Sequence, residues 1–135
     1  QHVGARWRAH YDRLHLHTIK ALSGLPFFPF PSSMPKYPSR DEVVAYLDAY
    51  AKHFNIAPRF GEDVTSIRRE DERWVSRSTE RVFISENLVL ATGYNRVPNL
   101  PSWPGMEGFQ GTCVHSVDYR NAEAYKGKRE PNFKR

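Results

Sequence analysis

Proline is distributed unevenly along this 135-residue chain, and its distribution limits where regular structure can form. Ten prolines are present, and they cluster at residues 26–38 and 98–104. Proline lacks a backbone N–H donor and clashes with the preceding helical turn, so these stretches are not helix interiors. We expect irregular connections there, with an extended, aromatic-rich loop packed on the core at residues 25–31.

The clearest predicted helix spans residues 40–54. Ser39 and Glu42 form the S-x-x-E pattern of a capping box, in which the hydroxyl and the carboxylate satisfy backbone N–H groups reciprocally. Apolar residues then recur at helical spacing on one face: Val43, Leu47, Tyr50 and Phe54. Asn55 and Pro58 are typical of the end of a helix.

The hydrophobic period changes after this helix. Residues 64–69, 73–78 and 81–85 read as short strands separated by polar turns, which predicts a small antiparallel meander. The apolar run Leu88–Ala91, closed by Gly93, predicts a buried strand of a larger sheet.

The remaining segments carry weaker patterns. Residues 111–116 are expected to form a short strand and residues 118–125 a short helix, and residues 129–135 read as a basic, polar tail. A helix, a meander and a buried strand in this order match the second half of a dinucleotide-binding domain. We therefore expect an α/β fold whose opening strand, Gly-rich turn and helix would lie upstream of this sequence.

Composition excludes several classes of protein. The chain is 39% hydrophobic and 26% charged, which argues against disorder. Its net charge of +5 fits a basic surface, a nucleic-acid partner or an anionic cofactor. Nucleic acid is disfavoured, because the sequence has no basic run interleaved with aromatic residues. No stretch is long enough to span a membrane, and no signal-peptide pattern is present.

Cysteine and histidine usage argues against a metal site. Cys113 is the only cysteine, so the chain has no internal disulfide, and we expect a reducing, cytoplasmic location with Cys113 buried in a short apolar run. Five histidines invite a metal hypothesis, but no acidic residue or cysteine joins them at a known ligand spacing: His10, His15, His17, His53 and His115. We expect no metal.

Two segments carry a resemblance to a known family. Residues 109–119 read F-x-G-x-x-x-H-x-x-x-Y, and residues 87–94 are an apolar run that ends in Ala-Thr-Gly. With supporting phrases at residues 7–18, 28–31 and 37–40, the chain resembles the flavin-containing monooxygenases. It is nearest to the bacterial members and the plant indole-3-pyruvate monooxygenases. Tyr119 argues against the related Baeyer–Villiger monooxygenases, which usually place Trp there.

The resemblance implies a cofactor pair and a reaction. Members reduce FAD with NADPH and transfer one oxygen atom from O2 to a small organic substrate, with the flavin supplying the difficult chemistry. The resemblance covers most of this chain but only about a third of the length of a full family member. We expect residues 1–96 to be a partial FAD-binding domain and residues 97–128 the crossing into the NADPH-binding domain. The chain would then be an internal or truncated piece, ending in the divergent tail 129–135.

The resemblance also assigns roles to individual residues. Trp7 and the pair His17-Thr18 match positions that line the flavin and nicotinamide, with His17 as the catalytic candidate. Many members carry Asn where His17 stands, although an imidazole can still donate a hydrogen bond. The alternatives are a core aromatic for Trp7 and a surface histidine for His17.

Further positions are candidate cofactor contacts. Arg40 would contact an FAD phosphate or the adenine, or else be a solvated first-turn arginine. Val64 would offer its backbone to the adenine, or else pack in the core. Ala91, Thr92 and Gly93 end a predicted strand where ligands bind open α/β sheets.

His115 is expected at the junction of the two domains, because Gly111 permits close backbone approach and the prolines at residues 98–104 stiffen the crossing just upstream. There it would orient NADPH or steady the closed arrangement of the domains. The alternative is that His115 only caps a buried turn. A different class of function also stays open for the whole chain: a non-catalytic remnant, or a basic binding module without FAD. The oligomeric state is left open.

We predict that the isolated chain does not hold FAD tightly. The sequence contains no G-x-G-x-x-G, the pattern whose tight turn and helix N-terminus bind a pyrophosphate. Titration of the purified chain with FAD, followed by flavin fluorescence, checks this. Tight stoichiometric binding would contradict it.

Overall fold

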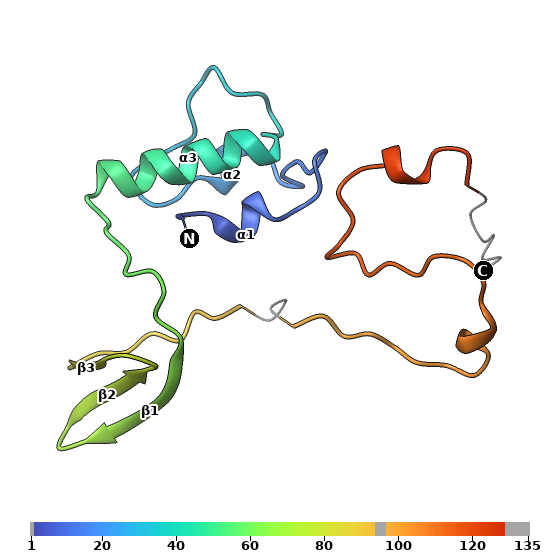
Figure 1. Cartoon of the computed structure of the whole chain (residues 1–135). Coiled ribbons are helices and arrows are strands. Elements are labelled where there is room, and N and C mark those ends of the chain that lie inside the picture. Colours follow the sequence, from blue (N-terminus) through green and yellow to red (C-terminus); the bar gives the residue numbers. More distant parts are fainter. Residues whose placement is uncertain (1, 94–96, 129–135) are drawn as a thin grey trace.

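The computed structural model describes residues 2–93 and 97–128, so the expected domain boundary at residue 96 and the tail 129–135 lie outside the described residues. The helices and strands are α1 (Ala5–Arg8), α2 (Lys20–Ser23), α3 (Arg40–His53), β1 (Val64–Glu70), β2 (Arg73–Ser78), β3 (Val82–Ser85), and two single 3₁₀ turns, η1 (Met106–Gly108) and η2 (Glu123–Tyr125). Figure 1 shows a helical part around α3, a separate small sheet, and an extended segment that leads from β3 to the C-terminal loops. Within the described ranges, no helix has the length and apolar character needed to cross a membrane.

Helix α3 confirms the predicted helix and its cap. The backbone N–H of Ser39 donates to Glu42 Oε2 at 2.7 Å, and the Glu42 N–H donates back to Ser39 Oγ at 3.4 Å. The Ser39 hydroxyl also donates to Glu42 Oε2, at 2.8 Å, and the two hydrogen bonds that the Ser39 N–H and hydroxyl give to this carboxylate lower the pKa of Glu42 below its ordinary value. At the other end, Asn55 takes a left-handed conformation with φ 51°, as expected just past a helix.

The core lies between α3 and the aromatic loop. Tyr46 is 2% exposed and stacks on Phe30, with ring centroids 3.8 Å apart. Its hydroxyl donates to the Phe28 carbonyl and accepts the Leu25 N–H, both at 2.6 Å. The prediction that this proline-rich loop packs on the core is therefore confirmed, although Phe27 within it is 93% exposed.

The segments before α3 are held by backbone contacts. Residues 14–16 run beside residues 38–40: the Leu16 N–H donates to the Pro38 carbonyl at 2.9 Å, and the Arg40 N–H to the Leu14 carbonyl at 2.7 Å. The Lys20 ammonium donates to the carbonyls of Pro31 and Ser32 at 3.2 and 2.7 Å, and also to that of Met34. One lysine thus closes the loop that precedes the capping box.

The predicted meander is confirmed as a three-stranded antiparallel sheet in the order β1-β2-β3. Asp71 and Glu72 both have positive φ, 45° and 67°, and connect β1 to β2 as a two-residue hairpin turn. Val75 pairs with Arg68 on one side and Ile84 on the other, and is 7% exposed. Figure 1 shows this sheet below α3, joined to it by the chain that follows the helix.

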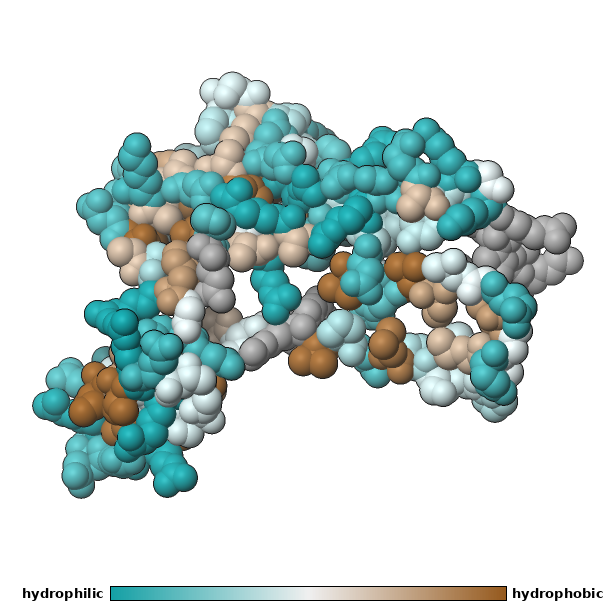
Figure 2. All heavy atoms as spheres, in the orientation of Figure 1, coloured by the Kyte–Doolittle hydropathy of each residue, from teal (hydrophilic) through white to brown (hydrophobic). Residues whose placement is uncertain are grey.

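The predicted buried strand at residues 88–91 is wrong. The structure has no strand there, and Val89 and Leu90 are 84% and 70% exposed. A strand needs a neighbour to take its backbone hydrogen bonds, and the sheet among the described residues ends at β3. Figure 2 shows hydrophobic residues at the surface of the sheet and along the segment that leads to the C-terminal loops.

Three smaller expectations near the C-terminus are also corrected. Residues 111–116 form no strand, and Cys113 is exposed rather than buried. Of the helix expected over residues 118–125, only the 3₁₀ turn η2 forms. Each pattern was short, and most side chains at residues 111–125 are exposed, so little burial supports regular structure there.

We predict that Ser39→Ala lowers the free energy of unfolding by roughly 1 kcal/mol. The substitution removes the side-chain acceptor of the first helical turn, and N-cap losses of this kind typically cost about that much. Chemical denaturation followed by circular dichroism measures the change.

Ser33→Ala is the matched control, because Ser33 is an exposed loop residue six positions before the cap. It should shift stability by less than about 0.5 kcal/mol. An unchanged midpoint in Ser39→Ala would mean that the capping box contributes nothing to α3.

Candidate functional site

The candidate site lies where the N-terminal segment, at residues 9–12, contacts the start of α3 and residues 119–121. The latter lie at the end of the F-x-G-x-x-x-H-x-x-x-Y pattern. Asp12 is the centre of the site. One carboxylate oxygen accepts a hydrogen bond from Arg40 Nη1 at 2.9 Å, and the other accepts one from Asn121 Nδ2 at 2.7 Å. The Asp12 N–H donates to the Arg120 carbonyl at 2.9 Å. Hydrogen bonds from Asn121 and then Arg40 lower the pKa of the Asp12 carboxyl.

Arg40 stands at the start of α3 with its guanidinium mostly covered. Its Nη1 also donates to the His10 carbonyl at 2.9 Å, and its Nε pairs with Asp41 at 2.9 Å. The side chain is 18% exposed, and the contact with Asp41, followed by that with Asp12, raises the pKa of Arg40. An anionic ligand at Arg40 would therefore compete with two carboxylates of this chain.

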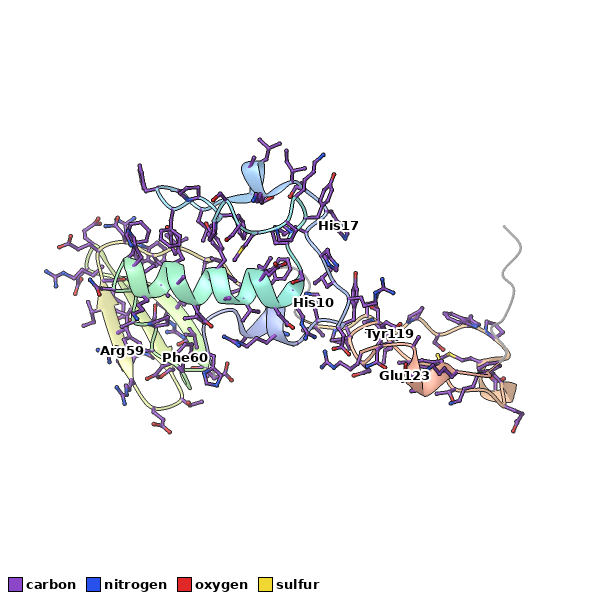
Figure 3. The ribbon with its side chains drawn as sticks, turned by 90° about the horizontal axis from the view of Figure 1, so that it is seen from above. His10, His17, Arg59, Phe60, Tyr119 and Glu123 are labelled. Carbon is purple, nitrogen blue, oxygen red and sulfur yellow. The ribbon has the colours of Figure 1, made fainter. Side chains whose placement is uncertain are left out.

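Aromatic rings and a second arginine complete the junction. The rings of Tyr11 and Tyr119 lie with centroids 6.2 Å apart. The Arg120 guanidinium donates to the carbonyls of Ala9 and His10, the latter at 3.4 Å. Figure 3 shows His10 and Tyr119 at this meeting point, with Arg59 and Phe60 at the other end of the molecule beside the sheet.

Trp7, His17 and Thr18 come from the same N-terminal segment. Trp7 lies in α1, is half-buried against the core, and has its ring 6.1 Å from that of His10. Thr18 shares a 2.6 Å hydrogen bond with Ser23 Oγ. His17 is exposed, and among the described residues its ring has no hydrogen-bond partner. Its imidazole is thus available to a ligand.

His115 lies in a turn just before Tyr119. Its Nδ1 accepts the Val117 N–H at 3.1 Å, and its carbonyl accepts the Asp118 N–H at 2.9 Å. The ring is half-buried. With Nδ1 serving the turn, Nε2 is the nitrogen left to meet a ligand.

The remaining candidates lie away from this junction. Val64 opens β1 and is 49% exposed. Ala91, Thr92 and Gly93 lie in the extended segment after β3, with exposed side chains. Gly93 has φ +70°, and among the described residues no atom lies within 4 Å of where its Cβ would be. Its backbone is therefore open to close approach.

The sequence did not reveal Asp12, Arg120 or Asn121 as members of the site. Asp12 sits inside the phrase at residues 7–18 that carries part of the resemblance, and Arg120-Asn121 directly follow the last motif tyrosine. No local spacing joins residues 109 positions apart, so only the fold could pair Asp12 with Asn121. Within residues 2–93 and 97–128, no group of three or more potential metal ligands is present.

Comparison with known proteins identifies the family. The model of the flavin-binding monooxygenase-like family matches residues 5–130. Indole-3-pyruvate monooxygenase YUCCA4 of Oryza sativa subsp. japonica is 39% identical, over 94% of this chain and 33% of its own length. Indole-3-pyruvate monooxygenase YUCCA1 of the same organism is 40% identical, over 94% and 32%. The chain thus spans about a third of the length of these curated relatives.

Solved structures agree with this assignment. The flavin-containing monooxygenase from Stenotrophomonas maltophilia aligns with a TM-score of 0.79 and 28% identity, over 90% of this chain and 37% of that protein. The bacillithiol disulfide reductase Bdr from Staphylococcus aureus, 18% identical with a TM-score of 0.61 over 67% of this chain, shares the fold alone. The predicted partial Rossmann-like flavoprotein fold is confirmed, and the chain belongs to the flavin-binding monooxygenase-like family.

Proposed function

We propose that this chain works as part of an NADPH-dependent, FAD-containing monooxygenase that inserts one oxygen atom from O2 into a small organic substrate. The match of the family model over residues 5–130 carries the proposal. The two rice relatives are named for indole-3-pyruvate, which makes this 2-oxo acid the first substrate to test. On the single cysteine we further propose a cytoplasmic location.

The donor set of the N-terminal segment and the extended segment fits a flavin dinucleotide in part. His17 offers an unpaired imidazole, Trp7 a half-buried indole, and the Thr92-Gly93 backbone an open approach. Arg40 fits less well as a phosphate ligand, because Asp12 and Asp41 already hold its guanidinium. Bound FAD would supply the electron transfer and oxygen chemistry, which side chains lack.

We assign these residues orienting and water-excluding roles. His17 would donate a hydrogen bond to the flavin from one ring nitrogen, and Thr18 would line the same side. Trp7 would shield the ring system from water, since its indole already packs on the core. Val64 and Ala91 would contribute backbone groups to the adenine side of the cofactor.

A chimaera tests the proposed function. Residues 5–128 replace the matching segment of the rice enzyme YUCCA1, with the unaltered enzyme as control. We expect the purified chimaera to retain FAD and to oxidise NADPH in a manner that depends on O2 and indole-3-pyruvate, because the segment brings its own cofactor-lining residues. The measurements are the flavin absorbance and the rate of NADPH loss. A chimaera that is folded by circular dichroism but holds no FAD, or holds FAD without oxidising NADPH, would overturn the proposal.

The role proposed for His115 makes a separate prediction. His115→Ala in the chimaera should slow flavin reduction by NADPH about tenfold and weaken NADP⁺ retention, with FAD content unchanged. A tenfold loss corresponds to about 1.4 kcal/mol, the scale of one hydrogen bond to a charged group. Stopped-flow reduction under anaerobic conditions measures the rate.

His115→Asn separates this role from turn capping. An asparagine Oδ1 can accept the N–H two residues on, as His115 Nδ1 now does from Val117, but the ring and its Nε2 are lost. If His115 meets NADPH, both variants are slow. If it only caps the turn, His115→Asn behaves like the parent chimaera.

A further inference from the structure

The contacts around Asp12 form a clasp between two parts of the chain that are far apart in sequence. We use the name Asp12 clasp for Asp12, Arg40, Arg120 and Asn121. Asp12 is the only one of the four that touches each of the other three through the hydrogen bonds described above. Among the described residues, Arg120 separately donates to Ala9 and His10, and the Asp12 carboxylate is the group that links Asn121 to Arg40 at the start of α3.

The orientation of the Asn121 amide is fixed by its second bond. Its Oδ1 accepts the Glu123 N–H at 3.1 Å, so Nδ2 is the atom that faces Asp12 and donates to it at 2.7 Å. The carboxylate of Asp12 therefore receives one donor on each oxygen, from Arg40 and from Asn121. A donor at Asn121 and an acceptor at Asp12 are both required for this geometry.

The clasp lies between the two groups of predicted site residues. On one side is α1, which carries Trp7 and whose capping residue Ala9 gives its carbonyl to Arg120. On the other side are Tyr119, which is adjacent to Arg120, and His115, which lies four residues before Tyr119. A shift of the clasp would move His115 relative to Trp7, because no other side-chain hydrogen bond among the described residues joins these segments.

We propose that Asp12 is a positioning residue. It sets where residues 115–121 lie relative to the N-terminal segment, and hence where NADPH lies relative to the flavin. The inference rests on the proposed function for its catalytic consequence. Its structural part, that Asp12 fastens residues 119–121, stands on the hydrogen bonds alone. The two parts are tested by different measurements.

The test exchanges the donor and the acceptor of the hydrogen bond between Asn121 and Asp12. Asn121→Asp keeps the acceptor for the Glu123 N–H but sets a carboxylate against that of Asp12, so the clasp should open. Adding Asp12→Asn restores it: the new amide accepts from Arg40 through Oδ1 and donates to residue 121 through Nδ2. Asp118→Asn is the matched control, an exposed carboxylate replaced outside the clasp.

The first measurement is amide hydrogen exchange on the chain itself, which needs no cofactor. Exchange at the Asp12 amide, which donates to Arg120, should quicken about tenfold or more in Asn121→Asp and return to the parent rate in the double variant. Amides within α3 report whether the chain stays folded. Unchanged exchange at Asp12 in a folded Asn121→Asp variant would overturn the clasp.

The second measurement is flavin reduction in the chimaera. Asn121→Asp should raise the KM for NADPH and slow reduction severalfold at constant FAD content, and the double variant should recover both. If exchange responds and the kinetics do not, Asp12 is structural only and the positioning role is overturned. If the parent chimaera is itself inactive, the proposed function fails while the exchange result still decides the clasp.

Discussion

The packing of the N-terminal part of this chain depends on one tyrosine. Tyr46 is almost wholly buried, stacks on Phe30, and uses its hydroxyl both as donor and as acceptor to the backbone of the aromatic loop. Proline-rich loops have few internal hydrogen bonds, so their backbone groups need partners elsewhere. Because Tyr46 supplies two of them, the loop can lie on α3 without burying unpaired polar atoms. The segment that carries the site is tied to the start of α3 by backbone hydrogen bonds of its own, from the Leu16 N–H to Pro38 and from the Arg40 N–H to Leu14.

Features set by local sequence were predicted well. The capping box fixed the start of α3, and polar turns fixed the meander to within a residue or two. The buried face of α3 was predicted less well. Val43 is buried as expected, but Tyr46 is the most buried side chain of the helix, Tyr50 is half-buried, and Phe54 is 38% exposed. Which face of α3 is buried depends on where the aromatic loop packs against the helix, and the periodicity of the helix residues carries no information about that.

The errors share one physical cause. Residues 88–91 have the composition of a buried strand, yet strand formation depends on a partner, and the described residues provide none. The Asp12 clasp was missed for the same reason, since its members become neighbours only when residues 9–12 meet 119–121. His17 and His115 were identified only through family resemblance, and their hydrogen bonding could not be read from spacing.

The net charge of +5 does not show which charged side chains are already paired within the chain. Three arginines near the N-terminal segment are engaged within the chain: Arg8 with Asp48, Arg40 with Asp12 and Asp41, and Arg120 with backbone carbonyls. Carboxylates match the charges of Arg8 and Arg40, and carbonyl oxygens accept from Arg120, so these guanidinium groups contribute more to holding segments together than to attracting an anion. An anion that approached this junction would therefore meet guanidinium groups that already have partners within the chain. The placement of these segments, which those internal contacts set, therefore matters more here than the total charge.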